Sequence, residues 1–267
     1  MYKFGFIGTG NMGGAIASAV CKIIDAKSVV LADKFIEKST ELATKLGAVC
    51  GDNNIVARES KYIVLGVKPQ MMAETLGGIK EILGSRNDRF VIVTMAAGIE
   101  TSFYCEALGK EYPIIRIMPN MPVAIGRGMT VYCTAGGVTD EEKAEFEQAM
   151  SISGIVQELS EKLINAASAI SGSGPAFVFM FTESLADSAV KCGLPRDVAL
   201  KLAAQTVMGS GAMVLESGKH PAELKDAVCS PGGTTIEGVH ALEQAGFRSA
   251  VMNAVEETYA KNFNISK

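Results

Sequence analysis

The sequence contains no tryptophan, only six tyrosines and two histidines, and few charged residues for its length. The shortage of aromatic residues argues against a surface on which nucleic-acid bases stack. Charged residues make up 20% of the 267 residues, and the net charge is −4. Because nucleic acids are bound by basic surfaces, we expect no nucleic-acid partner.

The sequence also lacks the patterns of a metal-binding, secreted or membrane protein. Its six cysteines are scattered, without a CxxC pair or a histidine at metal-binding spacing. We interpret them as reduced, mostly buried residues of a cytoplasmic protein, and we expect no metal. The chain starts in an apolar strand pattern rather than a signal peptide. No uninterrupted apolar run reaches about 18 residues, so we expect no membrane-spanning helix and no membrane partner.

Strand and helix patterns alternate over residues 1–160, which predicts a mainly parallel sheet covered on both faces. Apolar, β-branched runs predict strands at 3–8, 28–32, 61–67, 90–95, 113–118, 129–134 and 154–159. Helical periods lie at 11–24, 35–46, 70–83, 101–108 and 139–150. Residues 120–128 are rich in proline and glycine, and we interpret them as an irregular loop near the site.

Residues 161–267 show helical patterns only. They cover about 161–170, 175–191, 196–217, 221–228, 234–245 and 247–262. The segments 177–181 and 207–215 are apolar around much of the helix, and such a surface must be buried. About one hundred residues cannot bury it alone, so we predict a homodimer; packing on the first domain is the alternative.

A glycine fingerprint, Gly8-Thr-Gly-Asn-Met-Gly13, follows the first strand and opens a helix. In that context GxGxxG predicts a dinucleotide site rather than an ordinary glycine-rich turn. Asp33, twenty residues after Gly13, suits the ribose 2′-hydroxyl of NAD. Lys34 instead suits the 2′-phosphate of NADP, so the preferred cofactor stays open.

Two later strand ends are candidate cofactor walls, because ligands of open α/β sheets bind beyond the carboxyl ends of the strands. They are Gly66-Val-Lys-Pro-Gln70 and Ala96-Ala-Gly98. Lys68 has the alternative interpretation of a solvated strand end. Ser171-Gly-Ser-Gly-Pro-Ala176 either approaches the nicotinamide or is simply a capped helix start.

The segment Ser230-Pro-Gly-Gly-Thr-Thr235 lies between two helical patterns. Proline and glycine shape a turn, and the hydroxyl residues open the next helix. A helix start exposes N–H groups that can hold a carboxylate. The alternative is an ordinary turn followed by a helix.

Taken together, these segments resemble pyrroline-5-carboxylate reductase over essentially the whole chain. The motifs most specific to that family are Arg116-Ile-Met-Pro-Asn-Met-Pro122, Ser171–Ala176 and Leu224–Gly238. The resemblance implies an α/β, Rossmann-like dinucleotide-binding domain over 1–160 and an all-α dimerisation and substrate-binding domain over 161–267. It also implies a homodimer, often assembled into a ring of dimers. The reaction would reduce 1-pyrroline-5-carboxylate to L-proline with NADPH or NADH.

The resemblance carries over to individual residues. Cofactor contacts would be Ile7, Gly8, Thr9, Gly10, Asn11, Met12, Asn53, Gly66, Val67, Lys68, Pro69, Ala96, Ala97 and Gly98. Substrate contacts would be Thr234 and Thr235, reaching the active site across the dimer. Asp33 departs from a strict NADP pattern.

The mechanism expected from the residues is mainly positioning. His220 and His240 are poorly placed as general acids, so we expect the imine to arrive protonated or to be protonated through water. The backbone N–H groups from Gly233 to Thr235 would hold the carboxylate, and the Thr235 hydroxyl would orient the ring nitrogen. Thr235 is therefore the predicted catalytic residue.

Two rival functions predict different residues or behaviour. A β-hydroxyacid dehydrogenase usually carries a lysine four residues after the last glycine of a GxxGxG turn, but Val178 stands four residues after Gly174. A non-catalytic regulator that binds a dinucleotide would bind without turnover, and it would not need the loop at 230–235.

Overall fold

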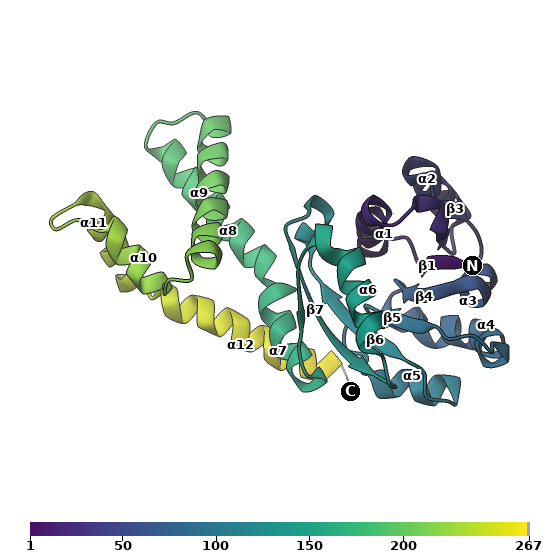
Figure 1. Cartoon of the computed structure of the whole chain (residues 1–267). Coiled ribbons are helices and arrows are strands. Elements are labelled where there is room, and N and C mark those ends of the chain that lie inside the picture. Colours follow the sequence, from purple (N-terminus) through teal and green to yellow (C-terminus); the bar gives the residue numbers. More distant parts are fainter. Residues whose placement is uncertain (266–267) are drawn as a thin grey trace. The chain divides into compact units, whose positions relative to one another are not determined.

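The computed structural model describes residues 1–265 (Figure 1). The chain forms two compact units. The first holds residues 1–172 together with the last helix from Tyr259 onward, and the second is Ser173–Thr258. An α/β unit followed by a helical one confirms the predicted fold class.

The first unit is built on one sheet with the order β3-β2-β1-β4-β5-β6-β7-β8. Its strands are β1 Tyr2–Ile7, β2 Val29–Ala32, β3 Val49–Cys50, β4 Ser60–Leu65, β5 Val91–Thr94, β6 Ile114–Pro119, β7 Gly128–Ala135 and β8 Gly154–Glu158. The strands pair in parallel except for β6 and β7, which are antiparallel. Strands β1 to β6 lie in the order 3-2-1-4-5-6, which is typical of dinucleotide-binding folds. In this arrangement the order of the strands across the sheet reverses at β1 and β4.

Helices cover both faces of this sheet. They are α1 Asn11–Ile23, α2 Ile36–Leu46, α3 Asn53–Glu59, α4 Met72–Ser85, α5 Thr101–Leu108, α6 Asp140–Met150 and α7 Glu161–Ser171, with 3-10 turns η1 Ala26–Ser28, η2 Pro69–Met71, η3 Met121–Ile125 and η4 Ser151–Ser153. One apolar cluster joins the sheet to α1, α2 and α6, and a second joins it to α3, α4 and α5. The two clusters explain why the strands read as continuous apolar runs.

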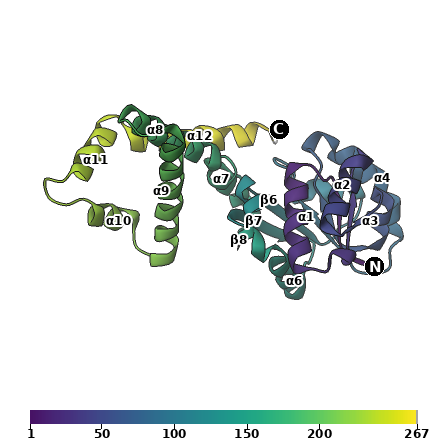
Figure 2. The same ribbon diagram turned by 90° about the horizontal axis from the view of Figure 1, so that it is seen from above.

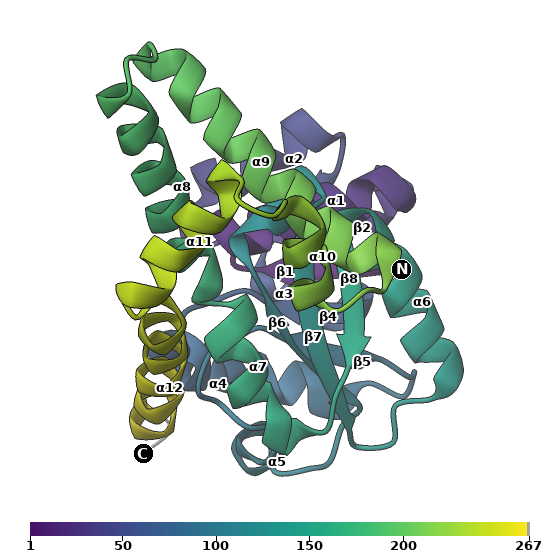
Figure 3. The same cartoon turned by 90° about the vertical axis from the view of Figure 1, so that its left-hand side faces the viewer.

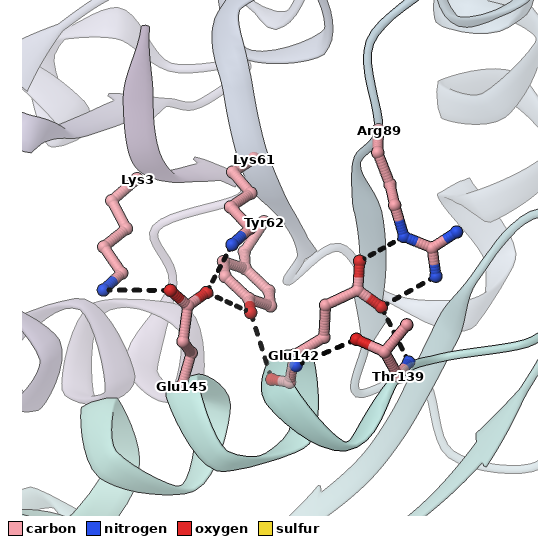
Figure 4. Close-up of polar contacts among 7 residues, drawn as sticks. All are labelled: Lys3, Lys61, Tyr62, Arg89, Thr139, Glu142 and Glu145. Atoms are coloured by element: carbon pink, nitrogen blue, oxygen red, sulfur yellow. Dashed lines mark hydrogen bonds and ion pairs between the residues drawn. The ribbon is translucent and has the colours of Figure 1, made fainter.

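Acidic side chains anchor helix α6 to the neighbouring strands (Figure 4). The Glu145 carboxylate accepts hydrogen bonds from Lys61 Nζ at 2.5 Å and from the hydroxyl of Tyr62 at 2.7 Å. The Glu142 carboxylate pairs with Arg89 and closes a capping box with Thr139 at the start of α6. These contacts hold α6 against the sheet, and none of these residues lines the cleft described below.

Two local predictions were wrong or incomplete. Residues 120–128 are not wholly irregular, because Met121–Ile125 form the 3-10 helix η3. The short elements β3 and α3 went unpredicted. Helix α3 has only seven residues, too few for a helical period, and depends on the Asp52 side chain, which accepts a hydrogen bond from the N–H of Ile55 at 2.8 Å.

The second unit is helical. Its elements are α8 Gly174–Lys191, α9 Arg196–Ser217, α10 Pro221–Val228, α11 Thr234–Gln244 and most of α12 Phe247–Ile265. Helices α8 and α9 form a hairpin (Figure 3) that turns at Gly193, where φ is +99°. Alanines 186, 199 and 203 pack where the two helices meet.

This unit leaves much of its apolar surface uncovered. Large exposed side chains include Phe179, Met180, Leu202, Met213, Leu215 and Met252. By length and hydropathy alone, Glu161–Lys191 and Arg196–Ser217 are long and apolar enough to cross a membrane. The sequence predicts no membrane-spanning helix because neither segment is an uninterrupted apolar run, whereas the mean hydropathy of each helix is high enough to meet this criterion.

Candidate active site

Three glycines bring the end of β1, the start of α1 and the end of β4 into backbone contact. A Cβ added to Gly13 would lie 2.2 Å from the carbonyl oxygen of Gly8, and one added to Gly66 would lie 2.6 Å from the same atom. Gly8 itself has a φ of +97°, which side-chain-bearing residues rarely adopt. Close packing and backbone geometry therefore require glycine at positions 8, 13 and 66.

Gly10 differs, because a Cβ there would meet nothing within 4 Å. It is the N-cap residue of α1, makes no side-chain cap, and is followed by a first turn without acidic residues. The N–H groups of Asn11, Met12 and Gly13 have no acceptor within the helix. An open glycine beside free N–H groups at a positive helix end fits a pyrophosphate.

A cleft of about 730 Å³ opens beside this turn and joins the ends of β1, β2 and β4. Among the predicted residues it is lined by Ile7, Gly8, Gly10, Asp33, Lys34, Asn53, Gly66, Val67 and Lys68. Thr9 and Asn11 line an adjoining hollow that also includes Gly10. Met12 packs against the apolar core, and Pro69 opens η2. Residues that the sequence predicted to bind a cofactor, although far apart in the chain, thus make up most of the lining of one cleft.

Asp33 is held firmly at the edge of this cleft. Its Oδ2 accepts hydrogen bonds from the N–H of Thr9 at 2.7 Å and from the Thr9 hydroxyl at 3.1 Å, and its Oδ1 accepts one from the N–H of Phe35 at 3.0 Å. Partial burial raises the pKa of Asp33, but these hydrogen bonds and the charge of Lys38 outweigh it and lower the pKa below its usual value. The carboxylate is therefore ionised at neutral pH.

The second predicted wall, Ala96 to Gly98, follows β5 beside the end of β4 but does not line the cleft. The Ala96 side chain is buried in an apolar cluster, Ala97 is exposed, and Gly98 has a φ of +75°. Its contact with the nicotinamide stays a prediction.

Sequence reasoning missed a buried ion pair behind this wall. Arg116 of β6 is only 1% exposed and donates to Glu161 Oε1 at 2.9 Å. The same carboxylate accepts hydrogen bonds from the N–H and the hydroxyl of Thr101, the first residue of α5. Glu161, at the start of α7, thus ties the segment after β5 to the rest of the sheet.

The Ser230–Thr235 segment forms a tight turn and then a helix start (Figure 2). The N–H of Gly233 donates to the carbonyl of Ser230 at 3.0 Å, with Pro231 and Gly232 (φ +66°) between them, as in a type II turn. Helix α11 then begins at Thr234. Because the turn uses the Gly233 N–H, the free donors at the helix start are those of Thr234, Thr235 and Ile236.

The two histidines lie in the second unit and are exposed. His220 is the N-cap of α10, and its Nδ1 accepts a hydrogen bond from the N–H of Ala222 at 3.2 Å. His240 lies in the middle of α11. At Ser171–Ala176, helix α8 begins with a proline in its first turn, but Ser173 makes no side-chain cap.

Comparison with known proteins matches both units. Residues 161–265 match the family model "Pyrroline-5-carboxylate reductase dimerisation", and residues 3–97 match "NADP oxidoreductase coenzyme F420-dependent". The chain is 41% identical to the pyrroline-5-carboxylate reductase of Escherichia coli, covering 99% of this chain and 98% of that one. It is 38% identical to the enzyme of Methanosarcina acetivorans, with 99% and 98% covered.

The chain belongs to the pyrroline-5-carboxylate reductase family. Solved structures of the family agree over the full length. The Coxiella burnetii reductase superposes with a TM-score of 0.92 at 30% identity, covering 100% of this chain and 99% of that one. The Plasmodium falciparum pyrroline carboxylate reductase, solved with NADP bound, gives 0.87 at 34% identity, with 100% and 98% covered.

Proposed function

We propose that this chain reduces the imine of 1-pyrroline-5-carboxylate to L-proline, with NADPH or NADH as hydride donor. The observation that carries the proposal is that one member of the reductase family combines two features. One is a cleft bordered by glycines, and the other is a separate helix start that bears hydroxyl groups. The first can hold a dinucleotide, and the second can hold a carboxylate. A β-hydroxyacid dehydrogenase would carry a lysine where Val178 stands, and a non-catalytic regulator would not need the second feature.

The cofactor-binding residues follow from the cleft. The first-turn N–H groups of α1 would hold the pyrophosphate, with Gly10 allowing the close approach. Asp33 and Lys34 would face the adenosine ribose, and Val67, Lys68 and the Ala96–Gly98 segment would border the nicotinamide. When bound, the reduced nicotinamide supplies the hydride.

The helix start of α11 would bind the substrate. The N–H groups of Thr234 and Thr235 would hold the carboxylate, and the Thr235 hydroxyl would accept a hydrogen bond from the protonated ring nitrogen. A hydride added to the imine carbon moves the C=N electron pair onto nitrogen, which keeps its proton; the product amine then takes a second proton from water. This route requires no histidine, which accords with the exposed positions of His220 and His240.

Replacement of Thr235 by valine tests the assigned hydroxyl. Valine keeps the branched shape but cannot orient the ring nitrogen, so we expect kcat/KM for pyrroline-5-carboxylate to fall at least about tenfold. Thr235→Ser keeps the hydroxyl and should retain most activity, while cofactor affinity should change in neither variant. Near-normal kcat/KM in Thr235→Val would remove Thr235 from the mechanism.

We further propose a homodimer formed through the second unit, in the cytoplasm, with dimers assembled into a ring. The exposed apolar side chains of α8, α9 and α12 support the dimer, since such surfaces are normally covered by a partner. Such a dimer would cover the exposed apolar side chains of α8 and α9, which gives their hydropathy a role that needs no membrane. Each α11 helix start would serve the cofactor cleft of the partner subunit.

A further inference from the structure

We propose that this chain selects NADH over NADPH, and that Asp33 is the residue that makes the choice. The inference rests on the proposed function for the presence of a nicotinamide dinucleotide. From the sequence, Asp33 favours NADH and Lys34 favours NADPH, and the proposal assigns the choice to Asp33.

Asp33 occupies the position that reads the adenosine ribose. It follows β2 directly and lines the cleft beside the glycine fingerprint. Carboxylates at this place in dinucleotide-binding folds accept a hydrogen bond from the ribose 2′-hydroxyl. Thr9 holds one carboxylate oxygen and Phe35 holds the other, so the carboxylate cannot swing away when a phosphate approaches.

The hydrogen-bonding capacity of Asp33 suits a hydroxyl and not a phosphate. Its three hydrogen bonds, from Thr9 and Phe35, use three of roughly four acceptor sites on a carboxylate. The remaining site lies on Oδ1 and can accept from one hydroxyl. A 2′-phosphate carries a charge of about −1.5 to −2 at neutral pH, so it has little proton to donate and is repelled.

The cations of the cleft do not offset this carboxylate. Three lysines line the cleft, namely Lys34, Lys38 and Lys68, and all three are exposed; Lys38 Nζ lies 5.0 Å from the centre of the Phe35 ring. Exposed ammonium groups are hydrated and screened by salt, so each contributes only modest affinity, and the charge of Lys38 already acts on Asp33. The N–H groups of Thr9 and Phe35 already donate to Asp33, so they are not available to a phosphate there.

Titration calorimetry of NADH and NADPH, without substrate, measures the preference directly. We expect the wild-type protein to bind NADH at least about tenfold more tightly than NADPH, because one charge-assisted hydrogen bond contributes about that factor. Asp33→Asn keeps the shape and an acceptor for Thr9 but removes the charge. We expect this substitution to weaken the binding of NADH and to bring the affinities for NADH and NADPH within about threefold of each other.

Two control variants separate charge from loop geometry. Thr9→Val removes one hydrogen bond to Asp33 and should weaken both cofactors in proportion, leaving the preference intact. Lys34→Gln should change the ratio by less than about threefold. The proposal is overturned if the wild type binds NADPH more tightly, or if Asp33→Asn and the smaller Asp33→Ser both leave the ratio unchanged.

Turnover distinguishes this proposal from the proposed function. A protein that prefers NADH but does not reduce pyrroline-5-carboxylate contradicts the function alone. One that reduces it more efficiently with NADPH contradicts the cofactor choice alone.

Discussion

At the scale of single residues, the glycines of the fingerprint have different jobs although they stand three residues apart. Gly13 has no room for a Cβ, which would meet the Gly8 carbonyl oxygen at 2.2 Å. Gly10 has room, with nothing within 4 Å. Gly13 serves the packing of strand and helix, and in the proposed function Gly10 would let the ligand approach the backbone.

Alanine substitutions at these two glycines should therefore separate stability from binding. Gly13→Ala forces backbone apart and should lower the free energy of unfolding by about 2 kcal/mol or more. Gly10→Ala should unfold like wild type in urea, because its methyl group faces open space. Its affinity for NADH should nevertheless fall at least about tenfold, since the methyl occupies the place of the pyrophosphate. If the two variants were equally stable in urea and bound NADH equally tightly, this division of roles would be refuted.

Spacing alone predicted the fingerprint and Asp33, because both follow from where a strand ends. The three hydrogen bonds of Asp33 were out of reach, since they depend on how Thr9 and Phe35 are turned toward it. The same limit applies at Gly233. Its place in the loop was clear from sequence, but the use of its N–H within the turn was not.

At the scale of elements, the Arg116–Glu161 pair joins β6 to α7 and, through Thr101, to the start of α5. The hydrophobic periods predicted these elements well because each covers a buried face. They carry no information on which charged residues meet, and 45 residues separate this pair in the chain. Helix α3 and strand β3 are too short for any period to show.

The pair should also make stability depend on pH. Burial raises the pKa of Glu161, but the hydrogen bonds from Thr101 and the contact with Arg116 outweigh it and lower the pKa below 4.5. A lowered folded-state pKa stabilises the fold above the unfolded pKa, and that contribution is lost as the pH falls through the folded value. Below about pH 4.5 the wild-type free energy of unfolding should therefore decline.

Glu161→Gln should be less stable at pH 7 and show a shallower decline in acid. Loss of a partner from a buried pair costs about 3–5 kcal/mol, but the Glu161 side chain is 32% exposed, so we expect about 1–2 kcal/mol. Asp140→Asn, in an exposed pair with Lys143, should leave the free energy of unfolding nearly unchanged. Urea titrations at pH 7 and pH 4 measure both, and equal losses in the two variants would argue against a structural role for Glu161.

At the scale of the whole molecule, the proposed function divides between an α/β unit with a cleft for the cofactor and a helical unit whose α11 start would act as a clamp that binds the substrate. The change of pattern near residue 160 predicted an α/β part and a helical part, whereas the two compact units divide after Gly172 and the first unit also takes in α12 from Tyr259. The sequence could not show which subunit's clamp serves which cleft, because that depends on the assembly.

Mixed dimers test whether the clamp acts across subunits. Gly10→Ala impairs the cleft and Thr235→Val impairs the clamp, so each homodimer should be poorly active. If the clamp acts in trans, a mixed dimer contains one site with both parts intact and should regain up to about half of the wild-type activity, or about one quarter in a random mixture. If the clamp acts within its own chain, mixing restores nothing.

The central claim, that this chain is a reductase of a cyclic imino acid, is tested most directly by turnover with the purified protein. Oxidation of NADH and of NADPH should be followed with 1-pyrroline-5-carboxylate, and L-proline should be quantified in the same samples. We predict one proline formed for each reduced nicotinamide consumed, with the greater kcat/KM for NADH. Tight cofactor binding without proline formation from either cofactor would contradict the claim and indicate a dinucleotide-binding protein of another kind.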